Sequence, residues 1–302
     1  PRCPWYTSSE GIALRRDFRG IGPVATEGPS PTGTVALSRG SLDEPFQAGA
    51  RLMVGHTFDD SPYQVEASYF WLTTLDTSAQ TTDPAYNLFS PFTHFGVPAD
   101  SRVDNNDFVE IREVSRLESG EVDLKCVVPL PAGCPTTVLL FGVRHVGIRE
   151  EFDYLSQPKT SPPVTVHAHT VNNLWGPQIG GLVDFGHDGA WLHIEGKAAI
   201  CNNAVDRDLD ASVDGTGYTH PRLSQSGTAF VGDASACILW RPTSSMSAKI
   251  GYQALWCDEL ALAARNFDPD LASLTDSAAQ PPINRRGTVV YHGPFAGLQF
   301  SW

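Results

Sequence analysis

The sequence has few charged residues and no long uninterrupted apolar run. Only 18 % of its 302 residues are charged, below the quarter that is usual in soluble domains. The nearest candidate for a transmembrane helix, residues 126–143, is broken by Pro129, Pro131 and Pro135, so we predict no such helix. The chain opens on PRCPWYTSSE, which is not a signal-peptide pattern. A mature exported protein and a cytosolic one both fit that opening.

Basic residues are outnumbered by acidic ones. The chain has 21 Lys and Arg against 34 Asp and Glu, for a formal net charge of −13. A surface that binds nucleic acid must be basic, so we expect no nucleic-acid partner. Plain solubility explains the acidity as well as a more specific role would.

Sequence signatures of catalysis and metal binding are also missing. The chain contains no Gly-x-Ser-x-Gly, His-Glu-x-x-His or Cys-x-x-Cys pattern. We therefore expect that the protein is not an enzyme and holds no cofactor or metal. His167 and His169 share one strand face and are the best metal candidates. The Asp-rich stretch 206–215 lacks the glycine and distal glutamate of a calcium loop, so we expect a solvated loop tip there.

Alternation with a period of two is the dominant pattern that is present. In AWLHIEGKAAIC, residues 190–201, one parity carries Leu192 and Ile194 and the other carries His193, Glu195 and Lys197. Such alternation is typical of a β-strand with one apolar and one polar face. The same pattern recurs along most of the chain and predicts an all-β protein.

Short turns alternate with long polar segments between the predicted strands. The turns include DDSP, HDGA and PTSS. This order predicts a single up-and-down antiparallel β-barrel domain over residues 1–302, with about ten strands and twelve as the alternative. The expected strands are 6–16, 46–58, 63–75, 107–129, 137–156, 163–185, 190–206, 226–241, 246–262 and 287–302. The long polar segments are 18–45, 76–106, 157–163, 207–226 and 263–286.

The placement of aromatic residues favours a membrane barrel over a soluble barrel or sandwich. A transmembrane barrel has an apolar outer band, a polar lumen, aromatic girdles at both interfaces, short periplasmic turns and long outer loops. We therefore expect a barrel in the lipid of the bacterial outer membrane. The core aromatics of a soluble domain are the alternative. The aromatic residues near expected strand ends are Phe58, Tyr63, Trp71, Trp175, Phe185, Trp191, Trp240 and Trp256.

The chain ends on a strict alternation, AGLQFSW. The last strand of bacterial outer-membrane barrels commonly ends on an aromatic residue in this way, and the barrel-assembly machinery reads that strand. We expect Leu298, Phe300 and Trp302 to face lipid near the periplasmic rim, and Gln299 and Ser301 to face the lumen. Trp302 should close the barrel against the first strand, and the assembly machinery is an expected partner.

The charged parity of the strands should line the lumen. Rings of charged side chains select ions in channels, whereas paired charges can instead fill a narrow barrel. About eight strands give a filled interior and about sixteen an aqueous channel, so ten strands lie near the filled limit. Adjacent strands could pair Asp184 with Lys197, or Asp233 with Lys249. The expected lumen residues are Arg51, Glu66, Glu121, Asp123, Lys125, Arg144, Glu150, Asp184, His193, Glu195, Lys197, Asp233 and Lys249.

Two of the six cysteines flank a short turn-like stretch. Cys126 and Cys134 enclose VVPLPAG, which predicts a local disulfide and an oxidising compartment, with free thiols as the alternative. Three others fall on the inward parity of successive strands, where a lumen disulfide and packed thiols both fit. These three are Cys201, Cys237 and Cys257, and Cys3 is a candidate partner for any of them.

Eight fragments, in order along nearly the whole chain, carry a resemblance to a known family. They are SEGIALRRD, FQAGARLMVGHTFDDSPYQVEASYFWL, SRLESGEVDLK, LLFGVRHVGIREEFDY, TVNNLWGPQIGGLVDF, GKAAICNNA, FVGDASACILWRPTSSMSAKIGYQALWCDELALA and YHGPFAGLQF. In this order they resemble the planctomycete-type outer-membrane β-barrel porin family, the seventh barrel type in that naming series. The resemblance implies an envelope barrel, the family's name implies a pore, and no catalytic motif comes with it.

These expectations combine into three candidate functions. The first is an outer-membrane barrel that acts as a porin-like narrow channel or as a passive envelope component. The second is a structural or assembly barrel whose long loops pack into an envelope array, as a homo-oligomer or around a partner protein. The third is an outer-membrane enzyme built on loop residues.

Overall fold

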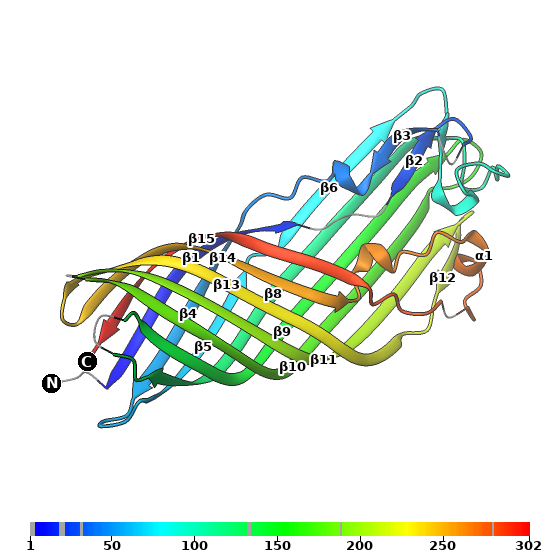
Figure 1. The fold of residues 1–302 in the computed structure, drawn as a ribbon. Coiled ribbons are helices and arrows are strands. Elements are labelled where there is room, and N and C mark those ends of the chain that lie inside the picture. The colour runs from blue at the N-terminus through cyan, green and yellow to red at the C-terminus, as the bar shows by residue number, and fades with distance from the viewer. Residues whose placement is uncertain (1–3, 18–21, 31–32, 132–133, 188, 280) are drawn as a thin grey trace.

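The computed structural model describes residues 4–17, 22–30, 33–131, 134–187, 189–279 and 281–302. Within them, ten antiparallel strands form a closed ring, because β1 pairs with β15 and β8 pairs with β9 (Figure 1). This confirms the all-β, up-and-down barrel that the alternation predicts. The ring strands are β1 (Trp5–Asp17), β4 (Gln47–Thr57), β5 (Tyr63–Leu72), β8 (Asn106–Val128), β9 (Thr136–Pro158), β10 (Val164–His187), β11 (Ala190–Val213), β13 (Leu223–Thr243), β14 (Met246–Leu260) and β15 (Gly287–Ser301).

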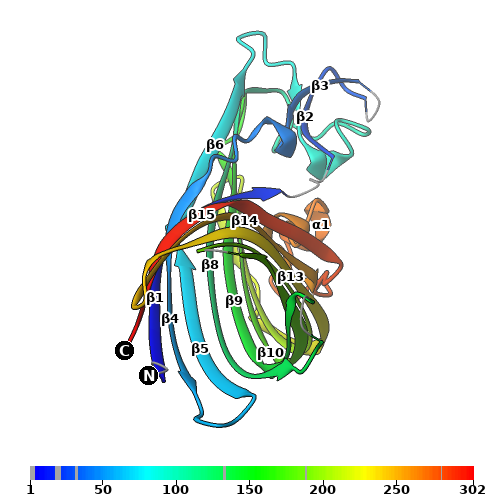
Figure 2. The same cartoon turned by 60° about the vertical axis from the view of Figure 1, so that its left-hand side comes forward.

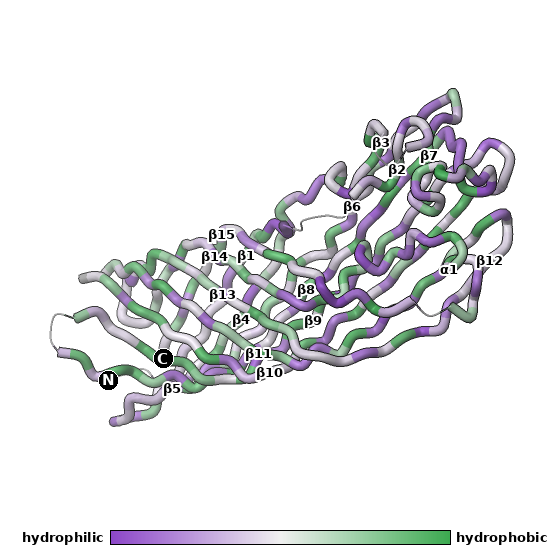
Figure 3. The backbone as a smooth tube through the Cα atoms, turned by 45° about the vertical axis from the view of Figure 1, so that its right-hand side comes forward, coloured by the Kyte–Doolittle hydropathy of each residue, from purple (hydrophilic) through white to green (hydrophobic). Residues whose placement is uncertain are grey.

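The ring has an apolar outer face and a polar or tightly packed inner face. In β11, Leu192 and Ile194 are exposed on the outside, while His193 and Glu195 line a cavity inside. The hydropathy of the residues alternates in the same way along the other strands (Figure 3). The exposed apolar side chains form an outer apolar band that includes Val54, Val122, Phe141, Val143, Ile179, Ile194, Ile238, Ile250 and Leu298.

Exposed aromatic side chains border the apolar band on both sides. Trp175 and Phe185 mark the two borders on β10 and lie ten residues apart, which matches the 9–11 residues of a transmembrane strand. We call the end of the barrel with the short turns the turn end and the opposite end the loop end. The turn-end border includes Trp5, Phe58, Tyr63, Trp240 and Trp302, and the loop-end border includes Tyr69, Trp71, Tyr252 and Trp256.

Four ring strands continue past the apolar band at the loop end. β8 and β9 have 23 residues and β10 and β11 have 24, against 10 in β5 and 13 in β1. We call these extensions, residues 106–118, 147–158, 164–173 and 202–213, the outer wall. Its outer face carries charged and polar side chains such as Arg112, Asp153 and His167, so the wall projects into water.

Loop segments cover the inner face of the outer wall. Ile111, Phe152 and Val166 of that face are fully buried in one apolar cluster with Leu37 and Phe92 of the covering segments. Figure 2 shows the short strands β2 and β3 beside the upper part of the wall. The smaller elements are β2 (Pro23–Glu27), β3 (Thr34–Ser38), β6 (Leu75–Thr82), β7 (Leu88–Phe89), β12 (Thr216–Thr219), η1 (Arg39–Ser41), η2 (Pro91–Thr93), η3 (Ala263–Arg265) and α1 (Leu271–Leu274).

The segments 18–45 and 76–106, predicted as polar loops, therefore contain strands. β5 pairs with β8 only as far as Glu118, and β6 pairs with β8 from Ser115 to Phe108. The extended part of β8 would otherwise present an unpaired edge, and sheets tend to cover such edges. The described residues include no helix long and apolar enough to cross a membrane.

The Asp-rich stretch 206–215 was expected to be a loop tip, and this expectation is wrong. β11 continues to Val213. The inward parity of this stretch carries Arg207, Leu209 and Ala211, which are buried on the inner face of the wall. Burial of that parity keeps the segment extended, and the aspartates lie on its outer face.

Candidate functional site

The ladder register brings charges of opposite sign together inside the barrel. Glu10 lies opposite Arg51, Glu121 lies opposite Arg144, and Asp233 lies opposite Lys197. Directly opposed residues on one face of an antiparallel pair are in side-chain contact distance. The interior is therefore built from cross-strand ion pairs rather than from rings of one sign.

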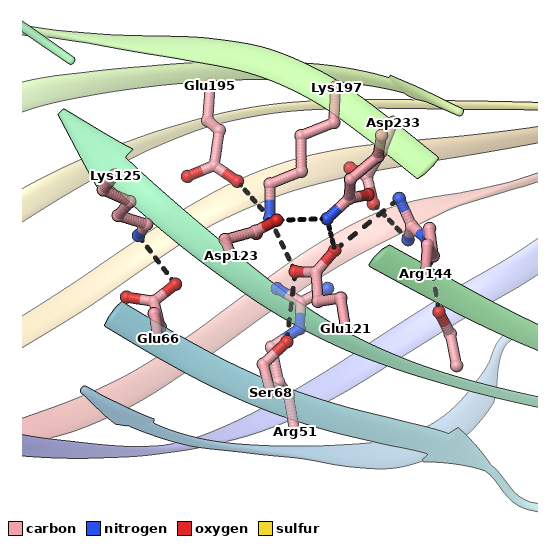
Figure 4. Close-up of polar contacts among 12 residues, drawn as sticks. Arg51, Glu66, Ser68, Glu121, Asp123, Lys125, Arg144, Glu195, Lys197 and Asp233 are labelled. Carbon is pink, nitrogen blue, oxygen red and sulfur yellow. Dashed lines mark hydrogen bonds and ion pairs between the residues drawn. The ribbon is translucent and has the colours of Figure 1, made fainter. Parts of the chain in front are cut away.

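Lys197 is the centre of the lower ionic cluster, which lies within the apolar band. From β11 its ammonium reaches Glu121 Oε1 at 2.5 Å, Glu195 Oε1 at 2.8 Å and Asp123 Oδ2 at 3.3 Å (Figure 4). The Lys197 side chain is only 6 % exposed. A buried ammonium is tolerated only when carboxylates compensate its desolvation, and here three do so.

Further pairs extend the lower ionic cluster around the wall of the barrel. Lys125 binds Glu66 at 2.6 Å, and Arg144 binds Asp233 at 2.8 Å. On the opposite side, Glu10 accepts from both Arg51 and Lys249. These contacts join strands β1, β4, β5, β8, β9, β11, β13 and β14 across the lumen.

A blind vestibule lies between the lower ionic cluster and the turn end. It has a volume of about 390 Å³ and is lined by charged and polar side chains from most ring strands. Near its mouth, His193 Nδ1 lies 2.7 Å from Asp184 Oδ1, and Gln299 and Ser301 line the rim.

An upper ionic cluster lies on the loop-end side of the lower one. Arg16 binds Glu113 at 2.7 Å and also binds Glu150. Arg39, from the covering loop, donates from Nε to Glu113 Oε2 at 2.7 Å. All four side chains are at most 2 % exposed. This cluster ties the barrel to the cover over its loop end.

The chain after β14 enters the lumen and fills it between the two clusters. Leu260, Ala261 and Leu262 are fully buried, and we call residues 260–266 the plug segment. Glu259 has a left-handed φ of 59° at an irregularity in the ladder, and Leu260 after it is the last residue of β14 and still pairs with Gly287. Gly287 on β15 leaves space for the plug, because a Cβ there would lie 2.5 Å from Leu262 Cγ.

Side chains of the barrel wall hold the plug segment by its backbone. Asn172 donates to Ala261 O at 2.8 Å and accepts from Ala261 N at 2.8 Å. Glu150 accepts from Ala263 N at 3.0 Å, and Asn203 donates to Glu259 O at 3.3 Å. A buried backbone segment needs such partners, so the wall is matched to this plug.

All thirteen residues expected in the lumen lie on the inner face. Ten of them line the vestibule, while Asp123, Arg144 and Glu150 are buried deeper. The suggested pairs are wrong, because Asp184 binds His193, and Lys249 binds Glu10. Glu150 belongs to the upper cluster, so the structure does not bring the thirteen into one site.

Several functional residues were missed at the sequence level. Glu10, Arg16 and Glu113 fall on the inward parity of their strands, so the alternation could have found them. Arg39 lies in the covering loop and has no such signal. The plug segment was split between the predicted strand 246–262 and a polar loop, although its LALAA composition marks it as buried.

The terminal strand lies as the alternation suggests. Leu298, Phe300 and Trp302 are 44 %, 46 % and 59 % exposed on the outer face. The Trp302 amide donates to Trp5 O at 3.0 Å, and the Trp5 amide donates to Trp302 O at 3.3 Å. These bonds close the seam between β15 and β1.

The predicted disulfide between Cys126 and Cys134 is wrong, since both thiols are free. The ladder places Leu139 opposite Cys126 and continues pairing to Val128 and Thr137. Cys134 therefore lies beyond the end of the ladder, out of bonding reach. The three inward cysteines are buried free thiols, namely Cys201, Cys237 and Cys257. Cys3 lies outside the described residues.

The described residues contain no group of three His, Cys, Asp or Glu placed to hold a metal ion. His167 contacts Asp153 at 2.5 Å, and His169 lies 3.4 Å from Asp208. Each histidine on the outer wall is thus engaged by a separate carboxylate.

The fold is similar to that of solved bacterial outer-membrane barrels. No protein-family model matches the chain, and no curated protein matches it either. The match to the outer membrane protease OmpT from Escherichia coli covers 99 % of this chain and 97 % of OmpT, with 8 % identity and a TM-score of 0.57. The translocator domain of autotransporter NalP from Neisseria meningitidis matches over 99 % and 89 %, with 9 % identity and a TM-score of 0.41. A Pseudomonas aeruginosa FadL homologue matches over 98 % and 89 %, with 9 % identity and a TM-score of 0.25.

The similarity to the fold of OmpT, with the apolar band and its aromatic borders, defines an outer-membrane β-barrel. The protein resides in the bacterial outer membrane, surrounded by lipid, as the sequence predicted. The turn end then faces the periplasm, and the outer wall faces the exterior. The expectation that the protein is not an enzyme is overturned, because a barrel of this architecture is a protease. At 8 % identity the similarity establishes the fold and no particular activity.

Proposed function

We propose that the protein is a closed envelope barrel and does not act as an open diffusion pore. The barrel anchors the protein in the membrane and holds the outer wall outside it. The observation that carries this proposal is the plug segment, with Leu260 and Leu262 at 0 % exposure inside the ring. Its backbone is held there by Asn172 and Glu150, at the base of the outer wall. Ionic clusters lie on both sides of it, and the vestibule lies between the lower cluster and the turn end. A ten-stranded ring is narrow enough for side chains to fill it.

The outer wall gives the closed barrel a surface outside the membrane. Four strands of 23 or 24 residues continue past the apolar band, and the covering segments bury the wall's inner face. The polar outer face of the outer wall supports a structural role in which the wall contacts a partner protein or a second copy of the chain. Recognition of β15 by the barrel-assembly machinery belongs to the same proposal and is supported by its terminal alternation.

Membership of the planctomycete-type barrel family is also part of this proposal. It is supported by the resemblance that the eight fragments carry, in their order along the chain. The longest early fragment, residues 46–72, spans the hairpin of β4 and β5. The family's name implies a pore. For this chain such a pore would be a narrow channel, which is the alternative to the closed barrel proposed above.

Conductance in planar bilayers tests the proposal. We expect the purified full-length barrel, inserted from detergent, to show no steady conductance at any voltage, because the plug segment excludes hydrated ions. A steady ohmic conductance of the unmodified protein would favour the narrow channel instead. Insertion is verified separately by a heat-modifiable gel shift, in which the folded barrel migrates differently from the boiled one.

A further inference from the structure

Two arginines face each other on the outer wall at the edge of the apolar band. Arg116 of β8 is directly opposite Arg149 of β9, and both are exposed. Like charges directly opposed on a sheet are destabilising. Within the described part of the chain, neither guanidinium has a carboxylate within 4.0 Å, whereas Arg112, four residues further along the same face, binds Asp76 at 2.6 Å.

A surface hollow of about 440 Å³ lies beside this arginine pair. Tyr69 and Trp71 form one side of it, with ring centroids 5.9 Å apart. The Tyr69 hydroxyl donates to Glu118 Oε2 at 2.7 Å, which holds the single carboxylate of the hollow. Gly147 leaves the floor bare, since a Cβ there would lie 3.0 Å from Glu118 Oε1.

The height of the hollow matches the headgroups of the outer leaflet. Tyr69 and Trp71 belong to the loop-end aromatic border, and aromatic belts lie at the headgroup level. Towards the turn end, Val122, Phe141 and Val143 are more than half exposed on the same strands. A lipid whose headgroup occupies the hollow would therefore lay its acyl chains on these apolar side chains.

We propose that Arg116 and Arg149 bind the phosphate of an anionic outer-leaflet lipid, with its polar headgroup against Tyr69 and Trp71. Guanidinium groups bind phosphate oxygens through paired, charge-assisted hydrogen bonds. A phosphate monoester carries close to two negative charges and is thus matched to two adjacent arginines. The lipid phosphate replaces the repulsion between the two guanidinium groups with attraction, which explains why an acidic protein keeps them unpaired and adjacent.

Native mass spectrometry of the full-length barrel in maltoside micelles tests this site. The probes are lipid A with its phosphates and dephosphorylated lipid A. We expect Arg116→Gln/Arg149→Gln to bind phosphorylated lipid A about tenfold or more weakly than the unmodified protein, from the loss of charge-assisted hydrogen bonds. The matched control is Arg112→Gln/Arg222→Gln, which removes one arginine of the outer wall and one just before β13, already paired with Asp76 and Asp206. It should change binding less than twofold.

The urea midpoint of the same variants gives a second measurement. Phosphorylated lipid A should raise the midpoint of the unmodified barrel by mass action and leave that of Arg116→Gln/Arg149→Gln unchanged. Equal weakening in the control variant, equal binding of dephosphorylated lipid A, or full displacement of the lipid by inorganic phosphate would each overturn the assignment. Conductance is independent of this site, so failure here leaves the proposed function intact.

Discussion

Lys197 shows how individual residues close the lumen. It binds three carboxylates, on Glu121, Asp123 and Glu195, and is almost fully buried. Removing one partner of a buried ionic group leaves the others desolvated and unpaired. The lower ionic cluster therefore depends on this side chain more than on any peripheral pair.

We expect Lys197→Met to destabilise the folded barrel by about 3–5 kcal/mol, because three buried carboxylates lose their shared cation. The measurement is the urea midpoint in detergent, followed by the heat-modifiable gel shift. Lys159→Met is the matched control, since Lys159 is exposed at the loop end. A similar midpoint for both variants would show that the lower ionic cluster adds little stability.

His167 predicts a pH dependence on the outer wall. Its hydrogen bond to Asp153 raises the pKa of the imidazole above the usual 6.5, with burial acting in the opposite direction. Folding therefore favours the protonated ring. The stabilising contribution of this pair is complete below about pH 6.5 and is lost as the pH rises through the raised pKa.

NMR titration of the histidine rings in micelles measures this effect. We expect Asp153→Asn to lower the pKa of His167 towards 6.5, because the charged acceptor is lost. Asp210→Asn, which removes a more weakly coupled carboxylate, should lower it less. A His167 pKa that is the same in all three proteins would contradict the assignment.

At the residue level, the sequence predicts which side chains point inward but not which of them meet. Parity assigns Asp184 and Lys249 to the lumen, yet their partners depend on strand register and side-chain reach. Lys249, for example, binds Glu10, which is far from it in the sequence. Such contacts form only when the ring closes. The alternation of polar and apolar residues does not show which strands become neighbours in the closed ring.

At the level of elements, the outer apolar band is the feature that requires lipid. Ile179 is 62 % exposed on β10, between Trp175 and Phe185. In water such exposure would be unfavourable along ten strands. The same strand carries the exposed Thr165 on its outer-wall portion.

We expect Ile179→Arg to destabilise the barrel in lipid vesicles by about 2–4 kcal/mol, the cost of an arginine at the bilayer midplane. Thr165→Arg, on the same face of β10 but outside the band, should have almost no effect. Urea unfolding in vesicles, followed by tryptophan fluorescence, compares the two. Equal midpoints would place Ile179 outside the membrane.

The ring strands could be predicted because each has a lipid face and a lumen face of different polarity. The short strands β2, β3, β6 and β7 could not, since they complete a sheet edge and a core that exist only after folding. The plug segment is missed for a related reason. Its apolar run looks like the end of a strand, and its first residue, Leu260, is in fact the last of β14, so the alternation does not mark where the chain turns inward.

At the scale of the whole molecule, the plug segment divides the barrel into a vestibule and a covered loop end. Leu260 and Leu262 contribute to an apolar cluster that spans the ring, together with Leu117, Ile148 and Leu174. Replacing buried leucines with a small polar residue leaves a cavity that water can enter. Under the proposed function, we therefore expect the plug to determine whether the lumen conducts.

We expect Leu260→Ser/Leu262→Ser to give a measurable conductance in planar bilayers, where the unmodified barrel gives none. The variant should also lose about 4 kcal/mol or more of stability, because two buried leucines are removed. Leu130→Ser, in the exposed turn after β8, is the control and should remain closed. A silent double variant that still shows the gel shift would mean that the ionic clusters alone seal the lumen.

The hydrogen bonds between Trp5 and Trp302 have a kinetic consequence. They join strands from opposite ends of the chain, so this seam is the pairing with the greatest sequence separation and the largest loop-closure entropy. Until it forms, the sheet has two open edges whose amides the hydrocarbon cannot solvate. Circularisation and full insertion should therefore be coupled in one late, rate-limiting step. Until then, β1 and β15 are the edges at which a folding helper could hold the unfinished sheet.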